Sequence, residues 1–226
     1  QRLTFQDYTY YVTAVSNSNF RLTYDRIVEV SYNFDLTDSV GMGVVAAITN
    51  GNGIGVADSD RNFDSDEFKN FYGKVSFEFE GDSIGFYGYT GREENSSSIK
   101  NEFFRIGPDF TIMIADTFRF WGNFLYGEDS NARFSSSGNT GEIESWGGFL
   151  GATYPFMDGW IASLLYNRVK VYGKQELDAN TLTVNLSYWL ARNFKLTAEV
   201  TADLEDTSAP RPQKTHTGVL GIVLAF

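Results

Sequence analysis

One histidine and one acidic segment are the residues best suited to chemistry in this chain of 226 residues. His216 is expected at the loop end of the last strand, and the chain has no Gly-x-Ser-x-Gly motif and no metal-type histidine spacing. A catalytic triad needs a nucleophile and an orienting acid beside the histidine. We therefore predict no catalytic residue and no enzyme. A barrel hydrolase that uses His216 is the least favoured alternative.

The acidic segment 57–67 partly imitates a calcium-binding loop. Asp58, Asp60 and Asn62 have the spacing of its first ligands, but Phe63 stands where glycine is needed and Lys69 where a bidentate glutamate is needed. We predict a solvated loop and no resident metal or cofactor. The alternative is a loop cation site built from four carboxylates: Asp58, Asp60, Asp64 and Asp66.

Composition excludes several classes of protein. Lys plus Arg total 18 and Asp plus Glu total 29, so the net charge of −11 argues against binding to nucleic acid. The chain has no cysteine, which removes disulfides and thiolate metal sites. No stretch reaches the ~18–20 apolar residues of a membrane-spanning helix. No charged-then-apolar signal segment opens the chain, so we expect a mature protein or one that was never exported.

Period-two alternation dominates the sequence and indicates β-strands with two unlike faces. Val28, Val30 and Tyr32, for example, alternate with Glu29 and Ser31. We predict a single domain over residues 1–226 with about 12 strands, each near the ~9–11 residues that cross a bilayer when tilted. The alternation appears within 28–34, 40–48, 73–79, 84–87, 104–110, 118–126, 146–154, 160–166, 182–190, 194–200 and 218–226, with an ambiguous face over 3–13.

The connections between these strands alternate in length. Short links are expected at 36–39, 80–83, 114–117, 155–159 and 191–193, and longer polar links at 50–67, 91–100, 127–142, 172–179 and 205–214. Only the link 15–19 is short where a long one is due. This alternation puts the tight turns at one end and the long loops at the other, as in a transmembrane β-barrel.

A soluble sandwich also alternates, but its apolar face packs against a second sheet. Three features favour lipid instead: charged residues at strand centres on the polar face, aromatic residues near strand ends on the apolar face, and an even strand count that allows closure. We predict a closed, antiparallel, up-and-down transmembrane barrel with short periplasmic turns and long extracellular loops. Its polar face is predicted to line a lumen with Glu29, Lys74, Glu78, Arg105, Asp109, Arg119, Lys195 and Glu199.

The last strand carries the most specific resemblance. Residues 218–226 alternate apolar and small residues and end in Phe226. This ending resembles the signal that the barrel-assembly machinery reads in bacterial outer-membrane β-barrel proteins, and the chain as a whole is similar in architecture to small porins. The resemblance implies that Phe226 is the true C-terminus, that a signal peptide has been cleaved, that the protein lies in the outer membrane of a Gram-negative bacterium, and that it contacts outer-membrane lipid and lipopolysaccharide.

A porin-like channel for passive diffusion of small hydrophilic solutes is the predicted function. Acids modestly outnumber bases on the predicted inner face, so cations should be weakly favoured. The alternative is a plugged barrel that serves envelope stability, partner binding or a larger outer-membrane complex. The sequence leaves open the solute, the state of the lumen, the oligomeric state, the conformation of the long loops and the role of the first strand.

Overall fold

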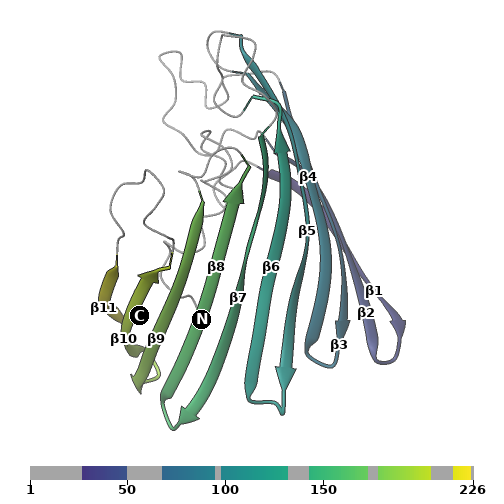
Figure 1. Ribbon diagram of the computed structural model, residues 1–226. Helices are drawn as coiled ribbons and strands as arrows, with labels where there is room; N and C mark the ends of the chain where they lie inside the picture. Colours follow the sequence, from purple (N-terminus) through teal and green to yellow (C-terminus); the bar gives the residue numbers. More distant parts are fainter. Residues whose placement is uncertain are drawn as a thin grey trace.

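The computed structural model describes residues 27–49, 68–94, 98–131, 143–172, 178–204 and 216–224. Within them the chain forms one antiparallel sheet of 11 strands, whose order in space is the order along the chain (Figure 1). None of these residues forms a helix of the length and apolarity needed to cross a membrane. The strands are β1 (Ile27–Thr37), β2 (Val40–Thr49), β3 (Asn70–Phe79), β4 (Asp82–Glu94), β5 (Lys100–Ile114), β6 (Phe118–Asp129), β7 (Ile143–Met157), β8 (Trp160–Val171), β9 (Ala179–Ala191), β10 (Phe194–Asp203) and β11 (Thr217–Leu224).

The sheet is open between β1 and β11. Each inner strand pairs with the strands before and after it, whereas β1 pairs only with β2 and β11 only with β10 in the described part of the chain. The additional strand predicted within 3–13 lies outside the described residues. The all-β, up-and-down architecture is therefore confirmed, while closure and a twelfth strand stay predictions.

The predicted alternation of short and long links is present. Tight turns join β1 to β2, β3 to β4, β5 to β6, β7 to β8 and β9 to β10, all at the lower end in Figure 1. In the β3–β4 turn, Glu80 and Gly81 both have positive φ, at 43° and 100°. Two successive positive values match the twist of a two-residue hairpin, which explains a turn without a longer loop.

Strands at the loop end extend further than the sequence predicts. The links expected at 91–100 and 127–142 begin too early, because β4 continues to Glu94 and β6 to Asp129. Near the loop end, the outward-facing positions of these strands are polar. The alternation therefore fades while backbone pairing continues, as between Arg92 and Glu102.

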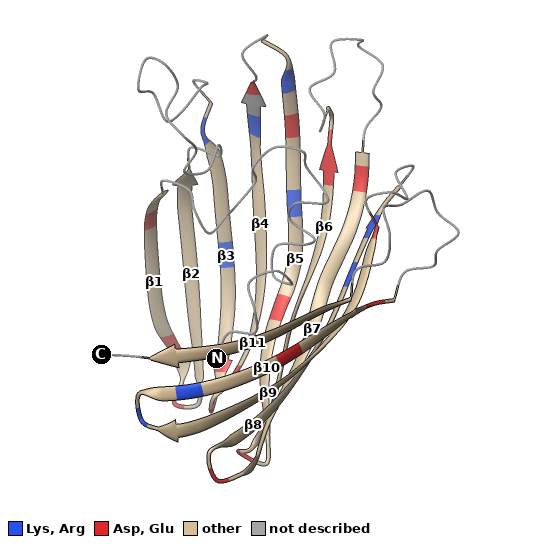
Figure 2. Cartoon of the chain, turned by 90° about the vertical axis from the view of Figure 1, so that its left-hand side faces the viewer, with Lys and Arg blue, Asp and Glu red and all other residues tan. Residues whose placement is uncertain are grey.

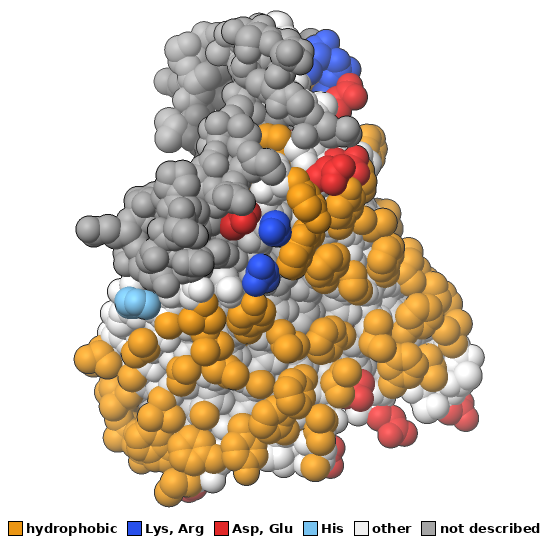
Figure 3. Space-filling view, viewed as in Figure 1, with side chains coloured by type: hydrophobic (Ala, Val, Ile, Leu, Met, Phe, Trp, Pro, Cys, Tyr) orange, Lys and Arg blue, Asp and Glu red, His pale blue; other side chains and the backbone are white. Residues whose placement is uncertain are grey.

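The outer face of the sheet is apolar and exposed. Val28 is 73% exposed, Val30 70% and Leu220 87%. Figure 3 shows a broad apolar belt of hydrophobic side chains on the face toward the viewer. Soluble proteins rarely expose apolar patches beyond a few hundred Å². No second sheet covers this face among the described residues, which contradicts the sandwich alternative.

Candidate functional site

The cross-strand register places all of the predicted pore-lining residues on one face, which we call the inner face. Glu29 lies opposite Ala47, Ala47 opposite Tyr72, and Tyr72 opposite Tyr89. Lys74 and Glu78 share the parity of Tyr72, and the pairing of Tyr89 with Arg105 carries the same face to β5. The inner face continues to β10 through four further cross-strand pairs: Arg105 with Gly127, Arg119 with Thr153, Asn185 with Glu199, and Trp189 with Lys195.

Lys74 and Asp109 form an ion pair that spans β4. The Lys74 Nζ lies 2.7 Å from both carboxylate oxygens of Asp109. Between them stands Gly85, where an added Cβ would lie only 2.7 Å from the Lys74 Cε and 2.8 Å from an Asp109 oxygen. The missing side chain at Gly85 is therefore what lets the two groups meet. Figure 2 shows basic and acidic positions in the middle of β3 and β5.

Arg105 and Asp129 form a second pair that is fully buried. The side chains are 2% and 0% exposed, and the Arg105 Nη2 lies 2.5 Å from the Asp129 Oδ2. Asn101 donates to the other carboxylate oxygen at 2.9 Å. Arg105 also donates to the carbonyl oxygens of Phe104 and Glu128, both at 2.8 Å. This network satisfies both charges, as a buried ion pair requires.

Tyr87 bridges a gap in the sheet. No pairing is recorded between β5 and β6 from Gly107 to Pro108, where proline has no N–H to give to the ladder. The Tyr87 hydroxyl lies 2.9 Å from the Asn123 side-chain oxygen and 3.2 Å from the Phe124 carbonyl oxygen. The tyrosine thereby ties β4 to β6 across the interrupted ladder.

The inner faces of β3–β6 and β8–β10 differ in chemistry. We call the first the tyrosine–charge wall, consisting of Tyr72, Lys74, Tyr87, Tyr89, Arg105, Asp109 and Asp129. We call the second the hydroxyl–amide wall, consisting of Ser163, Asn167, Thr181, Thr183, Asn185, Ser187, Thr197, Glu199 and Thr201. Both sets follow from the register of these strands.

Glu199 is a buried carboxylate of the hydroxyl–amide wall and is 3% exposed. The Asn185 amide donates to it at 3.2 Å and to the Thr197 hydroxyl oxygen at 2.9 Å. Thr183 and Thr201 share a hydrogen bond of 2.8 Å. A neutral amide therefore donates to this charge, whereas a guanidinium faces Asp129.

The remaining predicted charges have no ion-pair partner among the described residues. Glu29, Glu78 and Arg119 are exposed, and they lie on β1, β3 and β6. The Lys195 ammonium lies 5.6 Å from the centre of the Trp189 ring. No ion pair with a described neighbour therefore neutralises these groups.

Burial divides the inner face along its length. At the loop end Asn70, Asn101 and Asp129 are 0% exposed. At the turn end Glu78 and Arg119 are exposed. The inner face is thus accessible near the turns and occluded near the loops.

The described residues do not decide two other predictions, which concern the loop cation site and His216. Asp58, Asp60, Asp64 and Asp66 lie outside the described residues, so the loop cation site is not tested. In the described ranges, no cluster of three or more His, Cys, Asp or Glu side chains is arranged to hold a metal ion. His216 is exposed, one residue before β11.

Asp129 and Asn101 are site residues that the sequence prediction missed. The predicted link 127–142 includes Asp129, and the predicted alternation of the preceding strand begins only at 104, after Asn101. The sequence feature that could have identified Asp129 is its even spacing from Trp121 and Asn123 along β6, which puts all three side chains on the same face. A strand prediction that followed only the inner-face positions, at every second residue, would have included Asp129.

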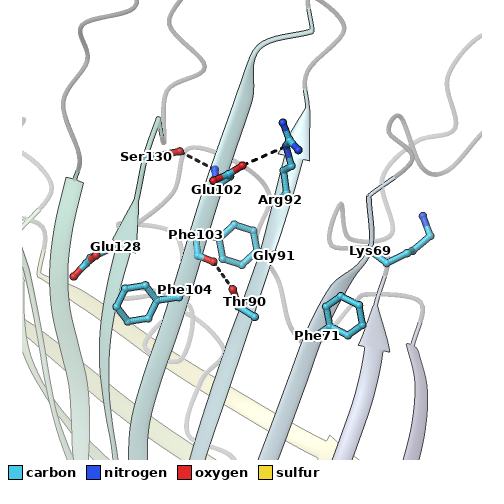
Figure 4. Close-up of a pocket in the computed structure, with 10 residues that line it drawn as sticks. All are labelled: Lys69, Phe71, Thr90, Gly91, Arg92, Glu102, Phe103, Phe104, Glu128 and Ser130. Carbon is cyan, nitrogen blue, oxygen red and sulfur yellow. Dashed lines mark hydrogen bonds and ion pairs between the residues drawn. The ribbon is translucent and has the colours of Figure 1, made fainter.

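An outer pocket lies near the loop end of β3–β6, with a volume of about 520 Å³ (Figure 4). Phe71 and Phe104 form its apolar part, and Lys69 and Arg92 contribute basic groups. Glu102 lies 3.6 Å from the Arg92 Nε, so the pocket holds charges of both signs.

No protein-family model matches the chain, and no characterised protein matches it in sequence. Among solved structures, it is similar to an outer membrane channel from Pseudomonas putida F1, with a TM-score of 0.42, 12% identity, and coverage of 87% of this chain and 80% of that chain. It is also similar to the trimer form of the outer membrane protein OmpT of Vibrio cholerae, with a TM-score of 0.43, 14% identity, and coverage of 88% and 90%. A mutant of the ferric enterobactin receptor of Pseudomonas aeruginosa gives a TM-score of 0.48 and 8% identity over 82% of this chain. The chain spans only 35% of that receptor's length.

Proposed function

We propose that this chain is an outer-membrane β-barrel that forms a narrow, weakly cation-favouring pore for small hydrophilic solutes. The observation that carries the proposal is the division of the sheet into two faces. Its outer face exposes apolar side chains, and its inner face carries the charged and hydroxyl groups. Lipid accepts only closed backbone pairing, and a polar interior offers solutes a path through the apolar layer.

A single additional strand would close this barrel in the antiparallel sense. Neighbouring strands alternate in direction, so β1 and β11 run the same way. One strand between them would be antiparallel to both. The segment predicted as a strand within 3–13 precedes β1 and supplies the twelfth strand in our proposal.

The weak preference for cations follows from which charges are paired. Lys74 with Asp109, and Arg105 with Asp129, contribute little net charge because each pair is closely matched. Besides these two pairs, the predicted lining residues include three acids and two bases: Glu29, Glu78 and Glu199 against Arg119 and Lys195. A modest excess of fixed negative charge lowers the barrier for cations more than for anions.

The proposal places the loop end outside the cell and the tight turns in the periplasm. It includes assembly through the C-terminal strand, whose Leu220 and Ile222 are 87% and 66% exposed on the outer face. It also includes contact with outer-membrane lipid and lipopolysaccharide. No chemical step is required, so we propose no enzymatic role.

A plugged barrel is the second candidate, and burial at the loop end favours it. Asn70, Asn101 and Asp129 are fully buried, and among the described residues neither side-chain polar atom of Asn167 has a hydrogen-bond partner. A barrel occluded in this way would stabilise the envelope, bind a partner through its loops, or serve as a subunit of a larger complex.

Conductance across a planar lipid bilayer tests the pore. The purified protein should give stepwise ion currents, and a salt gradient should give a reversal potential of the sign expected for cation preference. Glu78→Gln removes an exposed inner carboxylate and should reduce that preference. Glu128→Gln is the matched control, because Glu128 lies on the outer face and accepts a hydrogen bond from Tyr126.

Absence of current from folded protein would reject the pore and favour the plugged barrel. A clear anion preference would reject the assignment of selectivity to the excess of acids on the inner face. An equal change in reversal potential for Glu78→Gln and Glu128→Gln would show that the inner face does not set selectivity.

A further inference from the structure

An apolar groove on the outer face of β5–β8 has a cation at its loop end. Its volume is about 280 Å³, and Phe110, Phe124, Leu150 and Tyr166 contribute apolar lining. Gly148 deepens it, because an added Cβ there would lie 2.3 Å from the Asn123 carbonyl oxygen. Phe124 and Leu150 are 44% and 48% exposed, so the groove is continuous with the apolar belt.

Three successive outer levels of the sheet fix where the charges lie. Phe124, Gly148 and Arg168 are register partners on the first level. The second level contains Tyr126, Trp146 and Lys170, and the third contains Glu128 and Glu144. Successive levels are about 6.7 Å apart, since each step is two residues. The cations therefore lie nearest the apolar belt, and the acids lie further toward the loops.

Arg168 is held in this position by an aromatic side chain. Its guanidinium carbon lies 5.7 Å from the centre of the Trp146 ring. Trp146 in turn stacks on Phe124 with ring centres 6.2 Å apart. A guanidinium on an aromatic face keeps its N–H donors free for a planar or tetrahedral oxyanion. In Figure 3, basic and acidic side chains lie together in the upper part of this face, above most of the apolar belt.

The pocket in Figure 4 differs in its charge. There the Arg92 Nε faces Glu102 at 3.6 Å, and Glu128 also lines the pocket. An anion would have to compete with these carboxylates. At the β5–β8 groove the basic groups lie next to the apolar belt and the acids lie further toward the loops. This groove therefore matches a phosphate attached to an acyl chain better than the pocket does.

We propose that the β5–β8 groove binds one anionic phospholipid of the leaflet at the loop end. An acyl chain lies along Phe124, Leu150 and Tyr166, and the phosphate contacts Arg168 and Lys170. This inference rests on the proposed membrane location, but not on the proposed pore. Each basic group near a membrane surface attracts anionic lipid with about 1 kcal/mol, which corresponds to roughly a fivefold change in affinity.

Native mass spectrometry of the full chain in detergent, titrated with dioleoylphosphatidylglycerol, tests the site. We expect one retained lipid per chain for the unaltered protein and about fivefold weaker retention for Arg168→Gln. The double variant with Lys170→Gln should lose retention further. Arg92→Gln is the matched control and should leave retention unchanged. Inorganic phosphate should displace little lipid, because it cannot replace the acyl chain.

Retention of phosphatidylglycerol by the Arg168→Gln, Lys170→Gln protein at the unaltered level would overturn the proposal. Equal loss in Arg92→Gln would also overturn it, since it would indicate a general charge effect. Arg168→Lys keeps the charge and confirms that a folded protein is compared. Conductance of the same samples separates the two proposals. If the unaltered protein retains lipid but carries no current, the pore alone is rejected. If it carries current and the Arg168→Gln, Lys170→Gln protein still retains lipid at the unaltered level, the lipid site alone is rejected.

Discussion

The tyrosine–charge wall and the hydroxyl–amide wall form the same inner surface by different means. On the first, each buried or half-buried charge has an opposite charge beside it, as in Lys74 with Asp109 and Arg105 with Asp129. On the second, Glu199 is held by the neutral donor Asn185. The difference teaches that one inner surface can compensate a buried charge in two ways, with an opposite charge or with a neutral hydrogen-bond donor.

Glycine positions explain why the charged side chains lie flat on the tyrosine–charge wall. An added Cβ at Gly127 would lie 2.5 Å from the Arg105 Cδ, and one at Gly85 would lie 2.7 Å from the Lys74 Cε. Each glycine gives a long side chain room to cross its strand. On the hydroxyl–amide wall short side chains reach their neighbours directly, as Thr183 and Thr201 do at 2.8 Å.

The largest effect is expected from Arg105→Met. This change leaves the carboxylate of Asp129 buried without its cation, which should reduce the free energy of unfolding by about 3–5 kcal/mol. Urea unfolding in lipid vesicles measures it. Lys74→Met is the matched comparison and should cost about 1 kcal/mol or less, because that pair is partly solvated. Equal losses for the two variants would contradict the distinction between buried and solvated pairs. Asp129→Leu added to Arg105→Met should restore most of the stability.

A smaller effect is expected from Asn185→Ala on the hydroxyl–amide wall. Glu199 would lose a donor and Thr197 would lose a hydrogen bond, at a cost of about 1–3 kcal/mol. The same unfolding measurement applies. In a Glu199→Gln background the loss should shrink, since no buried charge then depends on the amide. An unchanged loss would show that Asn185 acts by packing and does not hold the carboxylate.

The smallest effect is expected from Gly85→Ala. The new methyl group meets the ends of two flexible side chains, Lys74 and Asp109, so the ion pair should lengthen at a cost of about 1 kcal/mol. A double-mutant cycle with Lys74→Ala isolates this contact. The two changes together should cost less than the sum of the single changes. Strict additivity would indicate that Gly85 does not make room for the ion pair.

Which face each residue occupies was predictable from the sequence, because strand periodicity is two and the two faces meet different surroundings. The alternation of Val28 and Val30 with Glu29 and Ser31 is an example. Pairing within the inner face was not predictable. Lys74 and Asp109 are 35 positions apart and meet only because the β3–β5 register brings both beside Gly85.

The ends of the strands were the least predictable feature. Above the apolar belt the outer residues become polar, as at Arg92 and Glu102, so the sequence there resembles a loop. Asp129 was missed for this reason, although it completes the most buried ion pair. The twelfth strand, predicted within 3–13, has an ambiguous alternation and stays a prediction.

Spin labels at successive positions of β3 test most directly whether the apolar face meets lipid. The chain has no cysteine, so single substitutions at Val75, Ser76, Phe77 and Glu78 label one site each. In lipid vesicles, labels at Val75 and Phe77 should collide with oxygen dissolved in the bilayer, and labels at Ser76 and Glu78 should collide with a water-soluble nickel complex. Contact of the Val75 and Phe77 labels with the nickel complex and of the Ser76 and Glu78 labels with oxygen would contradict the account, and so would contact with water at all four positions.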